Sequence, residues 1–123
     1  MKDIENRKDI EFLVDEFYKH VVKDDTIGFF FTNVVPVDWA KHMPIMYSFW
    51  ETLILGNGDY RGNPMLKHIS LNRKEKMLPK HFDKWLELWE TTIKANFKGE
   101  NAIKALQKAQ QIGGLMKFKV QTT

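Results

Sequence analysis

Apolar residues recur at three- and four-residue steps in four stretches of the chain, which is the spacing of helices with one buried face. These stretches are residues 4–22, 38–55, 79–97 and 101–116. In the first of them the repeating apolar positions are Ile10, Leu13, Val14, Phe17 and Val21, with Tyr18 at the edge of the stripe. No stretch shows the sustained alternation typical of strands. The pattern predicts an all-α domain.

Residues with strong backbone preferences mark where these helices begin and end. Asp38 is a residue type that caps helix N-termini, and Gly56 ends the second stretch. Pro79 is expected at the first position of the third helix. Between these two helices, Asn63-Pro64 predicts the start of a short helix that carries His68. The consecutive residues Phe29, Phe30 and Phe31 are expected to wrap a bend in the core.

Length and composition narrow the possible functions. The chain has 123 residues, so we expect one domain over 1–123 with a core of about 4–118. Its net charge of +3 is spread along the sequence, which argues against a nucleic-acid partner. Neither a signal region nor a membrane span follows Met1, so no membrane partner and a cytoplasmic location are expected. The absence of cysteine excludes disulfides, thiolate chemistry and covalent haem attachment.

Two of the four histidines stand among large apolar residues on different predicted helices. His42 lies on the apolar face of the second helix, and His68 lies in the short helix after Asn63-Pro64. His20 and His81 are expected at the surface. A single histidine near apolar residues is more often structural than a ligand. Two of them among Phe, Trp and Met suit a flat ligand with a central metal, such as haem.

Several segments around these histidines resemble the group III truncated haemoglobins. They are Phe17-Tyr18, Phe31, Trp39-Ala40-Lys41-His42, Phe49-Trp50, residues 58–64 (GDYRGNP), Lys67-His68 and residues 81–86 (HFDKWL). The resemblance extends from about Leu13 to Met116. It implies an all-α truncated globin fold, a two-over-two helical sandwich around a non-covalent haem b. Glycine pairs typical of the other truncated groups are absent from the corresponding places.

The resemblance also implies roles for individual residues. His68 would be the proximal iron ligand, and Tyr18 and Trp85 would be distal hydrogen-bond donors to bound oxygen. His42 would be the distal histidine, and Phe31 would pack on the haem face. Further haem contacts are expected from Met46, Phe49, Trp50, Met65, Leu66, Trp89 and Ile112, and contacts to the propionates from Tyr60, Arg61 and Lys67.

Three functions follow as hypotheses. The favoured one is a haem protein that binds O2, NO or CO reversibly at the iron. The second is a haem redox enzyme, which converts nitric oxide to nitrate or handles peroxide and needs an external reductase. The third is a helical interaction module without a cofactor. Two distal donors would slow oxygen release, which favours tight binding or redox chemistry over transport.

Overall fold

The computed structural model describes residues 1–31, 38–58, 60 and 76–121. Within these ranges the chain forms helices and no strand. The helices are α1 (Arg7–Val21), α2 (Trp39–Leu55), α4 (Pro79–Asn96) and α5 (Glu100–Gln121). They confirm the four predicted stretches. The short helix predicted after Asn63-Pro64, with His68, lies outside the described residues.

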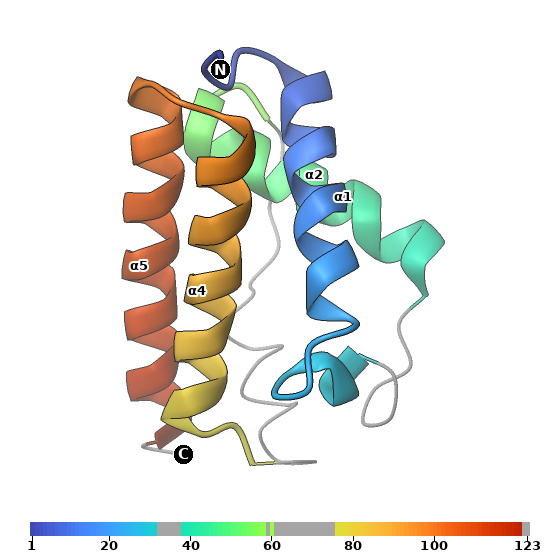
Figure 1. The fold of residues 1–123 in the computed structure, drawn as a ribbon, viewed down its shortest axis with the longest axis vertical. Coiled ribbons are helices and arrows are strands. Elements are labelled where there is room, and N and C mark those ends of the chain that lie inside the picture. The colour runs from blue at the N-terminus through green and yellow to red at the C-terminus, as the bar shows by residue number, and fades with distance from the viewer. Residues whose placement is uncertain (32–37, 59, 61–75, 122–123) are drawn as a thin grey trace.

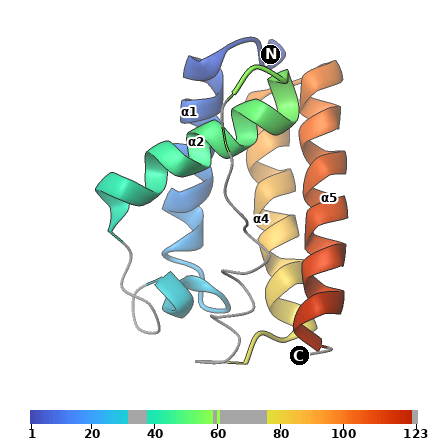
Figure 2. The same cartoon turned by 180° about the vertical axis from the view of Figure 1, so that it is seen from behind.

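The helices form two pairs, one over the other. Helices α4 and α5 run side by side in opposite directions, joined by a short turn close to the N-terminus of the chain (Figure 1). Helix α1 packs on both α2 and α4, and α2 crosses α1 obliquely and contacts α5 (Figure 2). This arrangement confirms the expected two-over-two helical sandwich. None of the described helices is both long and apolar enough to cross a membrane.

The sequence of α1 explains both how the helix begins and which of its faces is buried. The Asn6 side chain accepts the backbone N–H of Asp9 at 3.1 Å, which satisfies one of the free donors of the first turn. All five apolar residues of the predicted stripe are buried, as are Asp9 in the first turn and Ile4 just before the helix. The stripe therefore faces the core along its whole length.

Helix α2 begins and ends where the sequence indicates, with one difference at its start. Asp38 occupies the N-cap position, but its side chain makes no capping hydrogen bond. At the other end Gly56 adopts a left-handed conformation with φ +77°, and its N–H donates to the carbonyls of Glu51 and Thr52. Glycine adopts this conformation without the steric cost of a Cβ. Pro44 lies inside the helix and is exposed to solvent.

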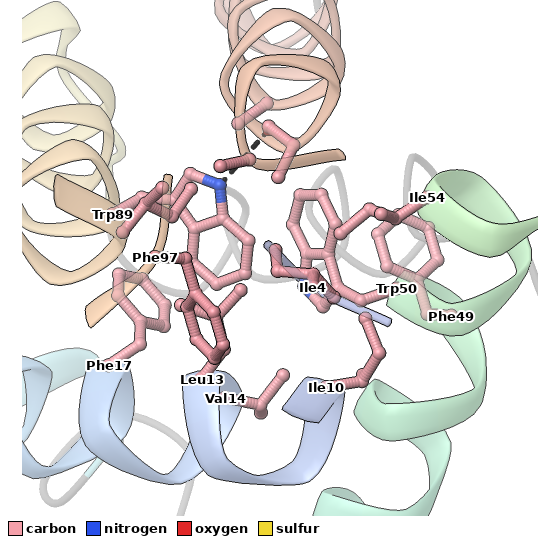
Figure 3. Close-up of a cluster of buried hydrophobic side chains, with 14 of the residues drawn as sticks. Ile4, Ile10, Leu13, Val14, Phe17, Phe49, Trp50, Ile54, Trp89 and Phe97 are labelled. Atoms are coloured by element: carbon pink, nitrogen blue, oxygen red, sulfur yellow. Dashed lines mark hydrogen bonds between the residues drawn. The ribbon is translucent and has the colours of Figure 1, made fainter. Parts of the chain in front are cut away.

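The core lies where α1, α2, α4 and α5 meet, and aromatic rings fill much of it (Figure 3). Trp89 has no exposed surface, its ring stacks on Trp50 with centroids 4.2 Å apart, and its N–H donates to the Ala105 carbonyl at 3.2 Å. Small residues on α5, such as Ala105 and Ala109, let that helix approach closely.

The expectation that His81 lies at the surface is wrong. Only 7% of its surface is exposed, and its Nδ1 accepts the backbone N–H of Leu78 at 2.8 Å. The rings of Phe29 and Phe30 pack edge-on against the imidazole, with centroid distances of 6.0 and 4.9 Å. His81 is therefore a helix-capping residue inside a second small core, whereas His20 is exposed as expected.

Candidate functional site

The hydroxyl of Tyr18 and the imidazole of His42 form a hydrogen bond between α1 and α2. Tyr18 lies in the last turns of α1 and His42 in the first turn and a half of α2, and the oxygen lies 3.1 Å from Nε2. Burial raises the pKa of Tyr18 well above its ordinary value, so its hydroxyl stays neutral and keeps its proton. The structure thus brings together two residues that the sequence predicted for the same site.

Aromatic rings surround this pair on several sides. The Tyr18 ring makes edge-on contacts with Phe17, Phe31 and Trp39, with centroid distances of 5.2, 5.7 and 5.6 Å. Trp39 also meets His42 edge-on at 5.7 Å and stacks on Phe31. The hydrogen bond between them therefore lies in a largely apolar setting, where it is stronger than in water.

Trp85, the third predicted distal residue, lies on α4. Its ring meets Phe17 edge-on at 6.0 Å and stacks in parallel with Trp89 at 6.4 Å. The side chain is partly exposed, and its N–H has no hydrogen-bond partner among the described residues. This donor is therefore available to a ligand, in contrast to the N–H of Trp89.

The remaining predicted contact residues fall into three sets. Phe31, Met46, Tyr60 and Ile112 are partly buried at the margin of the main core, where an apolar ligand could cover them. Phe49, Trp50 and Trp89 are buried within that core. The residues Arg61, Met65, Leu66, Lys67 and His68 lie outside the described ranges.

No role was predicted for Trp39 from the sequence, although its ring lies against both Tyr18 and His42. A signal was present, because Trp39 precedes His42 by three residues and such residues share a helix face.

Burial raises the pKa of Tyr60, whose ring packs edge-on against Phe49 at 5.0 Å.

Comparison with known proteins agrees with this architecture. The family model of the bacterial-like globins matches residues 3–120, and the chain belongs to this family. It is 33% identical over 110 residues to the group 3 truncated hemoglobin of Campylobacter jejuni, across 87% of this chain and 84% of that protein. The crystal structure of the group III truncated hemoglobin from Campylobacter jejuni matches 98% of this chain and 95% of its own, with a TM-score of 0.83 and 30% identity.

These matches confirm the resemblance read from the sequence. The protein is a haem-binding globin with the truncated fold of group III, and globins bind small diatomic ligands such as O2. Family membership argues against a helical module without a cofactor.

Proposed function

We propose that this chain holds haem b without a covalent bond, with His68 as the iron ligand, and binds O2, NO and CO on the side of Tyr18, His42 and Trp85. The chain has no cysteine to form a thioether bond to the vinyl groups. The described part of the site fits such a group, because it combines partly buried apolar side chains with a few hydrogen-bonding groups. Haem is likewise apolar over most of its area.

The hydrogen bond between Tyr18 and His42 carries the proposal. Bound haem supplies an iron that takes up a diatomic ligand, and the chain supplies the donors around it. A donor aimed at an acceptor with negative charge contributes about 1.5–3 kcal/mol. The hydroxyl of Tyr18 and the N–H of Trp85, which bonds to none of the described residues, therefore favour O2, which accumulates more negative charge than CO.

The tautomer of His42 determines whether the Tyr18 hydroxyl proton is donated to His42 or to the ligand. A hydroxyl donates one hydrogen bond and can accept others. When Nε2 of His42 carries the proton, it donates to the Tyr18 oxygen and leaves the hydroxyl proton for the ligand. In the opposite tautomer Nε2 accepts that proton, and the ligand loses a donor. We assign the first arrangement to the ligand-binding state.

Absorption spectra of the purified protein in ferric, ferrous and carbonyl forms test haem binding directly. The variant His68→Ala should lose haem, because no other protein ligand to the iron is assigned. The variant His20→Ala is the matched control, since His20 is exposed and should leave haem retention unchanged. Full haem retention by His68→Ala would refute the assignment of the iron ligand.

The variant Tyr18→Phe tests the distal donor. It should speed O2 dissociation roughly ten- to hundredfold and change CO dissociation little, since one hydrogen bond to a charged acceptor is lost. Equal effects on the two ligands would mean that the hydroxyl does not contact the ligand. A separate test mixes the O2-bound protein with nitric oxide and a reductant. Many catalytic cycles per protein molecule would favour the redox enzyme, whereas a single cycle would favour reversible binding.

A further inference from the structure

Polar contacts between α1 and α2 occur in a fixed order along one stripe of α1. Near its start, Arg7 Nη1 lies 2.9 Å from Glu51 Oε1 and 3.3 Å from Ser48 Oγ. Two turns later, the Tyr47 hydroxyl donates to the Asp15 carboxylate. The Tyr18–His42 bond comes three residues after Asp15. As the contacts advance along α1, their partners step back along α2, so together they define the register of the two helices.

The first two of these contacts, Arg7–Glu51 and Tyr47–Asp15, each involve a charged carboxylate, which suits them to hold this register. We name Arg7, Asp15, Tyr47 and Glu51 the interhelical clamp. The ion pair between Arg7 and Glu51 is half-buried, because the Glu51 side chain is 14% exposed and the Arg7 side chain 40%. The Arg7 guanidinium also lies over the Tyr47 ring, 5.9 Å from the centroid.

The Tyr47 hydroxyl remains a donor under physiological conditions. Burial, with the adjacent Asp15 carboxylate, raises the pKa of Tyr47 to about 12. A hydroxyl that donates to a carboxylate forms a charge-assisted bond, which is shorter and stronger than a bond between neutral groups. This bond is therefore of a stronger type than the one between the neutral Tyr18 hydroxyl and His42 if the imidazole is uncharged, and it lies one helix turn from Tyr18.

The clamp lies close to the pair that it aligns. Asp15 precedes Tyr18 by about 4.5 Å of helix rise, and Tyr47 follows His42 by about 7.5 Å. A hydrogen bond weakens steeply when its angle or length departs from the optimum. We propose that Tyr47 and Asp15 are positioning residues for ligand binding, because their bond keeps Tyr18 within reach of His42 and aimed at the ligand. This inference rests on the proposed function of Tyr18.

The proposal is tested by measuring the rates at which O2 and CO dissociate from the haem-loaded Tyr47→Phe variant and from the haem-loaded wild-type protein. We expect O2 dissociation to become roughly three- to tenfold faster, a part of the effect of deleting the Tyr18 hydroxyl, with CO almost unchanged. Asp15→Ala should act in the same way. Asp15→Asn should restore most of the wild-type rate, because its carbonyl oxygen still accepts the bond.

A matched control removes another interhelical contact of similar kind. Asp83 accepts a bond from Lys117 at 2.8 Å between α4 and α5, away from the clamp. Asp83→Ala should leave the ratio of O2 to CO dissociation rates unchanged. In the Tyr18→Phe background, Tyr47→Phe should add nothing to O2 dissociation, since the group it positions is gone.

The position of Tyr18 gives a readout independent of ligand kinetics. A crystal structure of Tyr47→Phe should show Tyr18 and His42 separated beyond the 3.1 Å of the native chain. An unchanged separation, or an equal effect of Tyr47→Phe in the presence and absence of the Tyr18 hydroxyl, would overturn the inference. If Tyr18→Phe alone has no effect on O2, the proposed function fails, and the crystal structure still decides whether the clamp sets the separation.

Discussion

The N-terminal segment caps α5 from the opposite end of the chain. Asp3 accepts the backbone N–H groups of Asn101 and Ala102, each at 2.9 Å, through its two carboxylate oxygens. In return, the Asn101 side chain donates to the Ile4 carbonyl at 2.7 Å. Gly99, with φ +145°, leaves room for the carboxylate, since a Cβ there would lie 2.5 Å from Asp3 Cγ. A residue almost a hundred positions away thus satisfies the first turn of α5.

The variant Asp3→Ala should therefore destabilise the whole domain. Loss of a capping side chain costs about 0.5–2 kcal/mol, and loss of a negative charge at a helix N-terminus costs about 0.3–1 kcal/mol. Because the two effects overlap, we expect the free energy of unfolding to fall by about 1–2 kcal/mol, and Tm by about 4–8 °C. Urea unfolding at pH 7 measures the first quantity. Glu5→Ala is the matched control, since among the described residues the Glu5 side chain makes only an exposed ion pair with Lys2 at 3.4 Å, and its backbone bond to Asp9 is kept in the variant.

The cost of Asp3→Ala should depend on pH. Partial burial of Asp3 works to raise its pKa, but the N–H groups of Asn101, Ile4 and Ala102 outweigh this and leave the pKa lowered. A lowered pKa in the folded state means that the carboxylate contributes stability above its unfolded value, about 3.9. That contribution is lost as pH falls through the lower folded pKa.

The difference in unfolding free energy between wild type and Asp3→Ala should accordingly be largest near neutrality and shrink below about pH 4. Two outcomes would refute the reasoning. One is a cost no greater than that of Glu5→Ala at pH 7. The other is a cost that stays the same at pH 7 and in acid, which would point to packing of the segment and not to the charge of Asp3.

Three further outcomes are expected. Trp89→Ala should lower the unfolding free energy by about 3–5 kcal/mol in urea, because it empties a fully buried site and removes the hydrogen bond from the indole to the Ala105 carbonyl; a cost below that of Asp3→Ala would contradict this placement. Gly56→Ala should cost about 1 kcal/mol in thermal unfolding, because φ +77° strains a residue with a Cβ; a gain in Tm would be inconsistent with the left-handed turn. Ultraviolet titration of the folded protein should show Tyr47 ionising with a pKa of about 12, and ionisation near pH 10 would mean that its bond to Asp15 is absent.

Local sequence was sufficient to predict the helices. The repeat of Ile10, Val14 and Phe17 follows the geometry of one helix turn, and Pro79 and Gly56 have backbone preferences that hold in any chain. These signals act between residues a few positions apart. They depend little on the rest of the fold, so the positions of the four described helices and the buried stripe of α1 were predicted correctly.

The sequence by itself also named the residues that the site should use, but through the resemblance to the truncated haemoglobins and not through periodicity. Periodicity placed Tyr18 only at the edge of a stripe and His42 on an apolar face. The structure decided that the two side chains meet at 3.1 Å, because this depends on the angle at which α2 crosses α1. The assignment of His68 to the iron remains a prediction from the sequence, since His68 lies outside the described residues.

Tertiary structure alone decided the contacts between distant parts of the chain. A histidine near a helix start is usually solvated, yet Phe29 and Phe30, in the segment that follows α1, pack against His81 at the start of α4. Likewise, nothing near Asp3 in the sequence indicates that it caps α5. Hydrophobic periodicity reports which face of a helix is buried, whereas the partner of each polar group is set by how the helices pack. For that reason the sequence determined the helices of this globin, and their packing determined its hydrogen bonds.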